Sequence, residues 1–505
     1  MRIGMPLLFA IAALLGSPAA ADGPLAHRDD LSPKDRARIA AILASPQDFS
    51  APQKYETMAG GATTSIAKVT RDAFSHFAAN LSFEGERDFK LGNGLFRRLW
   101  VSSPSSAQSS DGLGPLFNAR SCQRCHLEDG RGHPPDGPDD LATSMFLRLS
   151  VPPRTDAERK ALASRDILVV PEPTYGTQLQ DKAVAGLPVE GRMTIAYAEK
   201  LVSLSGGETM SLRSPAYGVR DLGYGPMDPD VMLSPRVAPP MIGMGLLEAI
   251  HPGDILAQAD PDDEDGDGIS GKPSMVRDPV SGDIVLGRFG HKASNPSVLV
   301  QSANAFAGDI GISNRLAQNP AGECTERQTA CLAMPDGVQD AAGPHEASDD
   351  ILDLVVFYAK NLAVPARREA GEPDVLRGKR AFHESGCAAC HTPAYVTSRD
   401  AEQEGHRFQL IWPFTDLLLH DMGEGLADGR PAGDATGREW RTAPLWGIGL
   451  AGAVNGHTSF LHDGRARNLL EAVLWHGGEA QAARDVVVAM EPTERADLIR
   501  FLESL

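Results

Sequence analysis

The chain has 505 residues, of which 42% are hydrophobic and 23% charged, and this balance excludes disordered and fibrous proteins. Its 48 basic and 67 acidic residues give a formal net charge of −19, which disfavours binding to nucleic acid and to anionic membranes. At roughly 150 residues per domain the length predicts about three domains, and the frequent glycine (51) and proline (37) residues predict many loops.

The first 21 residues have the pattern of an export signal. Arg2 supplies a positive charge, residues 5–15 form an apolar run, and Ala19-Ala20-Ala21 offers a cleavage site before Asp22. The apolar run is too short to cross a bilayer, and no cysteine follows it to carry a lipid anchor. We therefore expect a periplasmic protein without a membrane anchor. The alternative is a buried N-terminal helix.

Apolar stretches at residues 91–100 and 113–117 lead into the motif Cys122-Gln-Arg-Cys125-His126, and a second copy reads Cys387-Ala-Ala-Cys390-His391. C-x-x-C-H is the attachment signature of c-type haem. Its spacing lets two thiols bond the vinyl groups of one porphyrin edge, and the histidine then lies below the iron as its proximal ligand. The motifs predict two covalently bound haem groups. A zinc ribbon would leave both histidines unexplained, and a redox-active dithiol would need a βαβ context that the pattern lacks.

An acidic turn and a third cysteine pair lie between the two motifs. Asp263, Asp265 and Asp267 match the start of a calcium-binding loop, although Ser274 stands where an EF-hand has its glutamate. The sequence thus predicts a calcium site, with an exposed acidic turn as the alternative. Cys324 and Cys331 flank a short polar loop without a neighbouring histidine, and we expect them to form a disulfide.

Helical periodicity recurs around both motifs and indicates an internal duplication. Residues 349–362 are expected to close the first unit, and residues 375–382 and 495–505 are expected to frame the second. Each unit would be a cytochrome c-like domain, in which a helix before the motif crosses a closing helix. No long series of alternating strands appears, so we predict a mainly α fold with long loops.

The proposed domain limits follow from a proline-rich stretch at residues 365–373. The expected division is a signal peptide at 1–21, a first haem domain at 22–365 with an insertion at about 150–345, and a second haem domain at 366–505. A repeated sequence pattern also supports duplication. Arg236-Val-Ala-Pro239 precedes Gly243-Met-Gly245-Leu246, and Arg441-Thr-Ala-Pro444 precedes Gly447-Ile-Gly449-Leu450.

Several longer segments resemble the di-haem oxidoreductase family, a branch of the superfamily of bacterial di-haem cytochrome c peroxidases and MauG. The resemblance covers nearly all of the chain after the signal and lies in these segments: Asp111-Gly-Leu-Gly-Pro-Leu-Phe-Asn-Ala-Arg-Ser-Cys122, Ser234-Pro-Arg-Val-Ala-Pro239, Phe414-Thr-Asp-Leu-Leu-Leu-His-Asp-Met-Gly423, Arg441-Thr-Ala-Pro-Leu-Trp446 and Phe460-Leu-His-Asp-Gly-Arg-Ala466. It implies that one haem reacts with peroxide and the other relays electrons.

The resemblance also implies ligands and acid–base groups. The relay haem's second ligand in the superfamily, Met or Tyr, lies on the helix after the Asp-Gly-Arg segment, where this chain offers His476. Met422 is the alternative ligand; otherwise it packs beside the haem, with His420 bonded to a propionate. Glu471 occupies a position where a superfamily acid occurs, or it hydrogen-bonds Arg465.

For the first haem site and for electron transfer between the haem groups, the sequence offers several candidate residues. Glu248 is the expected distal acid, because a carboxyl in that apolar segment would be buried, with a raised pKa; the alternative is a solvated or helix-capping residue. Further candidates, each with packing as the alternative, are Met241, Met244, His251 and His291 on the distal side and Trp440, Trp446 and Trp475 for electron transfer.

These observations predict a periplasmic di-haem c-type oxidoreductase of the peroxidase type. It would take electrons from a small redox protein or a protein substrate and deliver them to peroxide. The alternatives are an electron-transfer cytochrome without chemistry of its own and a MauG-like enzyme that oxidises a partner protein.

Overall fold

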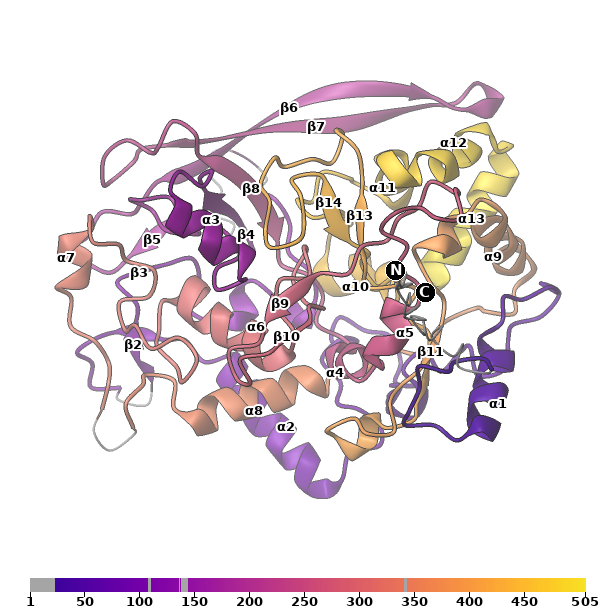
Figure 1. Cartoon of the computed structure of the whole chain (residues 1–505), viewed down its shortest axis with the longest axis horizontal. Helices are drawn as coiled ribbons and strands as arrows, with labels where there is room; N and C mark the ends of the chain where they lie inside the picture. The colour runs from indigo at the N-terminus through magenta and orange to yellow at the C-terminus, as the bar shows by residue number, and fades with distance from the viewer. Residues whose placement is uncertain (1–22, 108–109, 136, 138–143, 340–342) are drawn as a thin grey trace, which may run out of the picture.

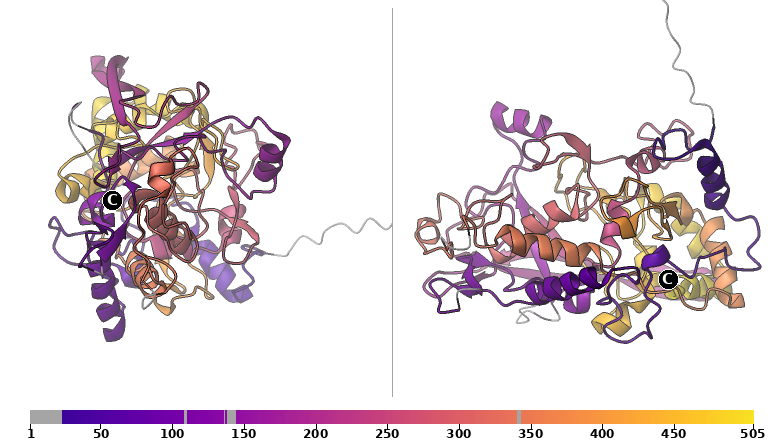
Figure 2. Two further views of the ribbon diagram at one scale, coloured as in Figure 1. Left: turned by 90° about the vertical axis from the view of Figure 1, so that its left-hand side faces the viewer. Right: turned by 90° about the horizontal axis from the view of Figure 1, so that it is seen from below.

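The computed structural model describes residues 23–107, 110–135, 137, 144–339 and 343–505, so the expected signal segment lies outside the described residues. The C-terminal helices at residues 481–504 lie toward one end of the molecule, and the helices at residues 156–163 and 329–332 lie toward the other (Figures 1 and 2). One continuous hydrophobic core nevertheless contains residues of both halves, from Phe74 and Phe89 to Phe501 and Leu505.

The helices are α1 (Pro33–Leu43), α2 (Phe83–Phe96), α3 (Asp156–Ala163), α4 (Met244–Glu248), α5 (Pro252–Leu256), α6 (Val298–Ala305), α7 (Thr329–Leu332), α8 (Asp349–Lys360), α9 (Pro373–Glu384), α10 (Ala451–Asn455), α11 (Leu469–Leu474), α12 (Gln481–Ala489) and α13 (Pro492–Ser504). The strands are β1 (Val101–Ser102), β2 (Asp111–Leu113), β3 (Leu116–Phe117), β4 (Met145–Ser150), β5 (Lys182–Ala183), β6 (Arg192–Ser203), β7 (Thr209–Arg220), β8 (Met232–Val237), β9 (Met275–Arg277), β10 (Ile284–Leu286), β11 (Tyr395–Val396), β12 (Leu410–Ile411), β13 (Leu419–Asp421) and β14 (Glu439–Arg441). None of these helices is long and apolar enough to span a membrane.

The same helix crossing occurs twice. Helix α2 packs on α8, and α9 packs on α13 (Figure 1). At the first crossing a Cβ on Gly92 would overlap the carbonyl of Leu354 and press on Tyr358. At the second, Gly378 meets Asp497 and Phe501 in the same way. Only glycine permits such a close approach of two helix backbones, so the duplication predicted from the sequence has a structural counterpart.

A second pair of glycines repeats as well. Gly243 and Gly447 begin equivalent helical turns with left-handed φ values of 70° and 72°. Their N–H groups donate to the carbonyls of Leu362 (3.0 Å) and Leu505 (3.2 Å), just beyond each closing helix.

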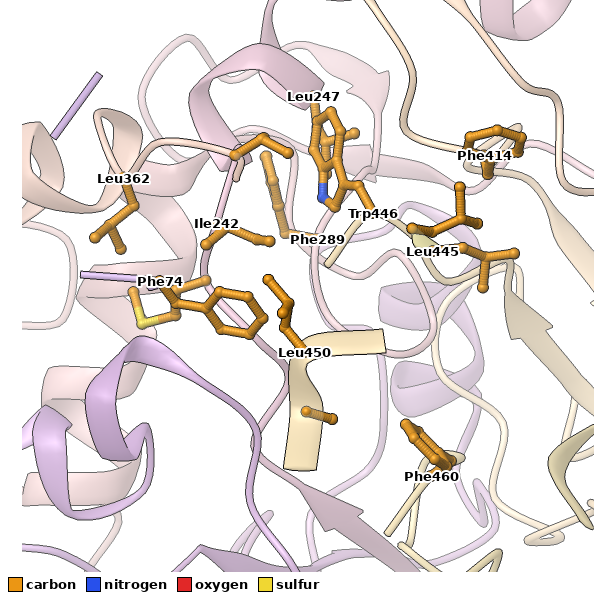
Figure 3. Close-up of a cluster of buried hydrophobic side chains, with 14 of the residues drawn as sticks. Phe74, Ile242, Leu247, Phe289, Leu362, Phe414, Leu445, Trp446, Leu450 and Phe460 are labelled. Carbon is orange, nitrogen blue, oxygen red and sulfur yellow. The ribbon is translucent and has the colours of Figure 1, made fainter. Parts of the chain in front are cut away.

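These two turns pack against each other. A Cβ on Gly243 would strike Trp446, and a Cβ on Gly447 would press on Ile242 and Phe74 (Figure 3). Each copy of the repeated sequence is therefore completed by a side chain of the other copy.

The expectation of a mainly α fold is confirmed only in part, because the insertion contains a long antiparallel hairpin. Strands β6 and β7 pair from Arg192 with Arg220 to Ser203 with Thr209, and Gly206 and Gly207 turn the chain with φ values of 81° and 80°. The hairpin runs along one edge of the molecule toward α12 (Figure 1). No strict alternation marks these strands, because different faces are buried along their length: Tyr217 and Val219 pack near the base, and Met210 and Leu212 pack near the tip.

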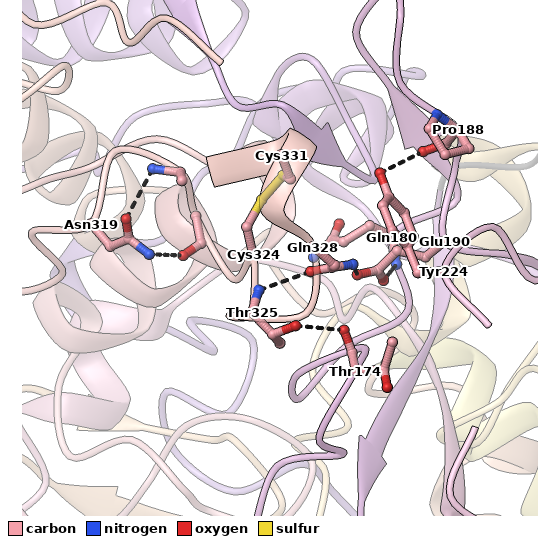
Figure 4. Close-up of a disulfide and its surroundings, with 12 residues drawn as sticks. Thr174, Gln180, Pro188, Glu190, Tyr224, Asn319, Cys324, Thr325, Gln328 and Cys331 are labelled. Carbon is pink, nitrogen blue, oxygen red and sulfur yellow. Dashed lines mark hydrogen bonds between the residues drawn. A yellow bond between two sulfur atoms is a disulfide. The ribbon is translucent and has the colours of Figure 1, made fainter. Parts of the chain in front are cut away.

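The predicted disulfide is confirmed: Cys324 and Cys331 are bonded, with 6.1 Å between their Cα atoms (Figure 4). Beside it Thr325 Oγ1 donates to the carbonyl of Thr174 (2.8 Å), and Gln328 Nε2 donates to Glu190 (2.6 Å). The disulfide loop is thus fastened to the segment that precedes the hairpin.

The helix crossing gives a test with a matched control on one helix. Gly92→Ala should destabilise the protein by about 1–3 kcal/mol because the added methyl group overlaps a backbone carbonyl. Gly94→Ala should be neutral or stabilising by up to about 1 kcal/mol, since no atom lies within 4 Å of its Cβ position. Denaturant unfolding of both variants measures the difference, and equal midpoints would contradict the crossing.

Candidate functional site

The two C-x-x-C-H segments fold into the same turn. Cys122–Arg124 and Cys387–Ala389 each form a short 3₁₀ turn. In each, the histidine N–H donates to the carbonyl of the first cysteine at 3.0 Å, His126 to Cys122 and His391 to Cys387. Among the described cysteines, only Cys324 and Cys331 form a disulfide, so the motif sulfurs are not consumed by one.

Both motif histidines are oriented by a backbone carbonyl. Nδ1 of His126 bonds the carbonyl of Pro239 (2.8 Å), and Nδ1 of His391 bonds that of Phe414 (2.9 Å). With the proton on Nδ1, the lone pair of Nε2 is available to a metal. Burial lowers the pKa of both histidines to about 4, which keeps them in the neutral form that binds iron.

Each histidine also lies beside its helix crossing. The rings of Phe96 on α2 and His126 have centroids 6.3 Å apart, and those of Phe382 on α9 and His391 are 6.4 Å apart. Phe96 and Phe382 are each the fourth residue after the crossing glycine, so the two crossings place the two motifs equivalently.

His476 is the second residue after α11, which Asn468 caps by accepting from the N–H of Glu471 (2.8 Å). Its Nδ1 donates to the carbonyl of Ala472 (2.8 Å), an orientation that again leaves Nε2 for a metal. Burial lowers the pKa of His476 and favours its neutral form. Burial is also the main cause of the low pKa of His391, and His476 is one of the ionisable groups whose electrostatic influence reaches it.

Met422 and His420, the other candidates at the second site, have different surroundings. Met422 packs against the core, with its carbonyl next to Gly477. His420 bonds Asp416 through Nε2 (2.7 Å) and Glu479 through Nδ1 (2.6 Å), and its Nδ1 lies 3.6 Å from the sulfur of Cys390. Burial alone disfavours a charged imidazole, but these partners outweigh it and raise the pKa of His420 to about 12.

Glu248 is not the buried acid that the sequence predicts. Its side chain is 21% exposed, and one carboxylate oxygen lies 2.6 Å from Nζ of Lys360. The other oxygen accepts the N–H of Val298 (2.6 Å) at the start of α6. The helix-capping alternative therefore describes its contacts, because its neighbours supply a cation and a helix N-terminus rather than an apolar pocket.

Glu471 is buried, as its place on α11 requires. Its partner is Arg467, which donates through its backbone N–H (2.9 Å) and Nε (2.8 Å). The expected alternative partner, Arg465, instead donates to Asp463 (2.7 Å). The catalytic roles of Glu248 and Glu471 stay predictions.

The distal candidates of the first site have different surroundings. Met241 is buried and Met244 only partly so. His251 starts α5 and accepts the N–H of Gly253 (3.1 Å). His291 bonds the carbonyl of Val237 (2.9 Å), and burial lowers its pKa to about 3.

Asp129, which sequence reasoning missed, is fully buried three residues after His126. It accepts from the hydroxyls of Tyr358 (2.7 Å) and Ser75 (2.5 Å), and burial raises its pKa to about 6. No local pattern distinguishes Asp129 from an exposed loop residue, because both hydroxyl partners are distant in sequence.

The three candidate tryptophans are buried in different surroundings. Trp440 stacks on His462 with ring centroids 3.7 Å apart, and the cations of Arg236 (4.4 Å) and Lys292 (4.6 Å) lie over its ring. Trp446 packs on Gly243, and Trp475 lies under the guanidinium of Arg465 (4.9 Å).

The acidic turn is assembled differently from the sequence prediction. Asp263 and Asp265 gather with Asp260, their nearest carboxylate oxygens within 4.8 Å of one another. Asp267 is not part of that group and accepts the N–H of Ile269 (2.8 Å) instead.

Two buried indole donors without a hydrogen bond belong to segments that carry residues of the second site. Nε1 of Trp475, next to His476, is buried without a hydrogen bond, and so is Nε1 of Trp412, two residues before Phe414. Two cysteine sulfurs and an adjacent neutral histidine are the donors that a C-x-x-C-H motif offers to haem c. The residues present therefore fit the group that the motif predicts.

A sequence model described as "Di-haem oxidoreductase, putative peroxidase" matches residues 54–505. The chain belongs to this family. Comparison with curated proteins gives no match. Among solved structures, a hydrazine synthase of Kuenenia stuttgartiensis pressurised with xenon is 13% identical, with 70% of this chain and 89% of that chain covered and a TM-score of 0.27, which is too low to support an argument.

The His420 cluster predicts a pH dependence of stability. Because the pKa of His420 is raised from 6.5 to about 12, the folded protein keeps a proton that the unfolded chain releases above pH 6.5. The stabilisation is complete below pH 6.5 and falls as pH rises, by up to about 1.4 kcal/mol per pH unit. Denaturant unfolding between pH 6.5 and 9 should show this slope, and His420→Gln should lack it. Parallel curves for the two proteins would exclude a charged His420.

Proposed function

We propose that this family member is a periplasmic c-type di-haem enzyme that reduces peroxide with electrons from a protein donor. The observation that carries the proposal is the pair of identical C-x-x-C-H turns, each with its histidine fixed by a backbone carbonyl and each beside the same helix crossing. The family match supports an oxidoreductase, and the export pattern of the first 21 residues supports the periplasm.

In this proposal each motif holds one haem, within domains at 22–365 and 366–505. Cys122 and Cys125 form the thioethers of the first haem and His126 its proximal ligand; Cys387, Cys390 and His391 do the same for the second. When bound, the two irons supply the redox equivalents that peroxide reduction consumes. The acidic turn with Asp263 and Asp265 serves as a calcium site.

His476 is the proposed sixth ligand of the second haem. Its Nδ1 is held by Ala472, and its electrostatic influence reaches His391. The adjacent Trp475 has a buried Nε1 without a hydrogen bond. Two histidine ligands generally give a lower potential than a histidine and a methionine, which suits an electron relay of low potential. Met422 is the competing ligand.

The remaining residues of the second site hold charge in place. Glu479 and Asp416 keep a positive charge on His420 beside Cys390, and Ser270 Oγ donates to Glu479 (2.7 Å). The imidazolium of His420 is therefore a fixed positive charge next to Cys390. Glu479, whose pKa is lowered to about 2 by His420 against the effect of burial, stays ionised at neutral pH.

Covalent haem attachment has a direct test. Protein matured in a haem-attaching host should carry the mass of two haem groups, and the Cys387→Ala/Cys390→Ala variant should carry one, because thioether bonds survive denaturation. Intact-protein mass spectrometry measures both. A Cys324→Ala/Cys331→Ala variant is the control and should keep two. A bare polypeptide mass would refute the proposal.

Peroxide distinguishes the enzyme from its alternatives. We expect peroxide to change the EPR signal of one haem in the oxidised protein and to oxidise a reduced donor cytochrome catalytically. Two low-spin signals that ignore peroxide would identify an electron-transfer cytochrome instead. A change of signal without turnover of donor, together with oxidation of a partner protein, would identify a MauG-like enzyme.

A further inference from the structure

The inserted hairpin touches the second half through polar contacts with the Asp463-Gly464-Arg465 segment. From β7, the hydroxyl of Tyr217 donates to Oδ2 of Asp463 (2.8 Å). Arg213 donates to the carbonyls of Gly464 (3.0 Å) and Arg465 (3.2 Å). Strand β7, from the first half of the chain, thus donates hydrogen bonds to three consecutive residues that resemble the family's Asp-Gly-Arg motif.

Asp463 is fully buried, so its carboxylate depends on these donors. Oδ2 accepts both from Tyr217 and from Nε of Arg465 (2.7 Å), and Oδ1 accepts the N–H of Arg465 (3.1 Å). The hydroxyl of Tyr217 is a neutral donor in this set, since burial and the adjacent Asp463 raise its pKa far above the usual value. It stays protonated and donating at any physiological pH.

Arg465 transmits this arrangement toward the second motif. Its Nε is bound to Asp463, its Nη1 donates to the carbonyl of Gly425 (2.5 Å), and its guanidinium plane covers Trp475. Trp475 is adjacent to His476, and Gly425 contacts the same indole ring. One chain of contacts therefore runs from Tyr217 through Asp463 and Arg465 to the residue next to the proposed ligand.

We propose that Tyr217 is a positioning residue for the second haem: its hydroxyl fixes Asp463 and Arg465, which hold Trp475 and thereby orient His476. The inference rests on the proposed ligation of that haem by His476. In this proposal the insertion in the first half of the chain orients the sixth ligand of the haem in the second half.

The test compares Tyr217→Phe with Tyr224→Phe in the full-length protein carrying its haem groups. Tyr224 is a matched control, because it lies in the same insertion and donates to the carbonyl of Pro188 (3.0 Å) but has no contact of this kind with the Asp463 segment. His476→Ala, measured in parallel, identifies the EPR signal of the second haem. Low-temperature EPR, redox titration of each haem and intact mass are recorded for all variants.

We expect Tyr217→Phe to shift the low-spin signal that His476→Ala abolishes, and to shift the midpoint potential of that haem, with haem content unchanged. The first haem should be unaffected, and Tyr224→Phe should match the parent protein. Arg465→Lys, which keeps the charge but loses the planar fork, should shift the same signal.

Three results would overturn the proposal. If His476→Ala changes the second haem but Tyr217→Phe does not, the ligand assignment stands and the positioning role is wrong. If His476→Ala leaves both haem signals intact, the ligand assignment fails and the positioning role fails with it. If Tyr217→Phe alters both haems, or Tyr224→Phe has the same effect, the hairpin stabilises the protein in general and does not orient the ligand.

Discussion

Two helix crossings without a side chain between them determine where the chemistry of this protein lies. At Gly92 and Gly378 the backbone of one helix touches the backbone of another, and this contact brings the fourth residue onward, Phe96 or Phe382, against the motif histidine. The histidine is then fixed from its other side by a carbonyl of Pro239 or Phe414. Because a Cβ at either glycine would overlap a backbone carbonyl, the helix crossings fix the positions of these phenylalanines beside the two motifs.

The local sequence predicts the motif turns and the helices around them. The motif spacing, the apolar helical stretches and the repeated glycine segments predict the two C-x-x-C-H turns, the closing helices α8 and α13 and the disulfide. Each of these features depends on neighbours within a few residues or on a pattern repeated in the chain. The family resemblance rests on longer segments, and the match over residues 54–505 agrees with it.

Partners distant in the sequence determine the contacts of the remaining site residues, and sequence patterns do not identify these partners. Glu248 lies in an apolar segment, yet Lys360, more than a hundred residues away, provides a cation beside it. Glu471 takes Arg467 rather than Arg465 because Asp463 already occupies the latter. Strands β6 and β7 lack alternation because the two ends of the hairpin pack on different neighbours, so no single periodicity marks them. The acidic turn recruits Asp260 in place of Asp267.

The reciprocal packing of Gly243 on Trp446 and of Gly447 on Ile242 has a consequence for how the protein comes apart. A duplicated protein of two independent lobes would melt in two steps, and either lobe would survive alone. Here part of the interior of each repeat is filled by side chains of the other repeat, within one continuous apolar core. We therefore expect the two repeats to unfold as a single cooperative unit, because removing either half would open the interior of the other.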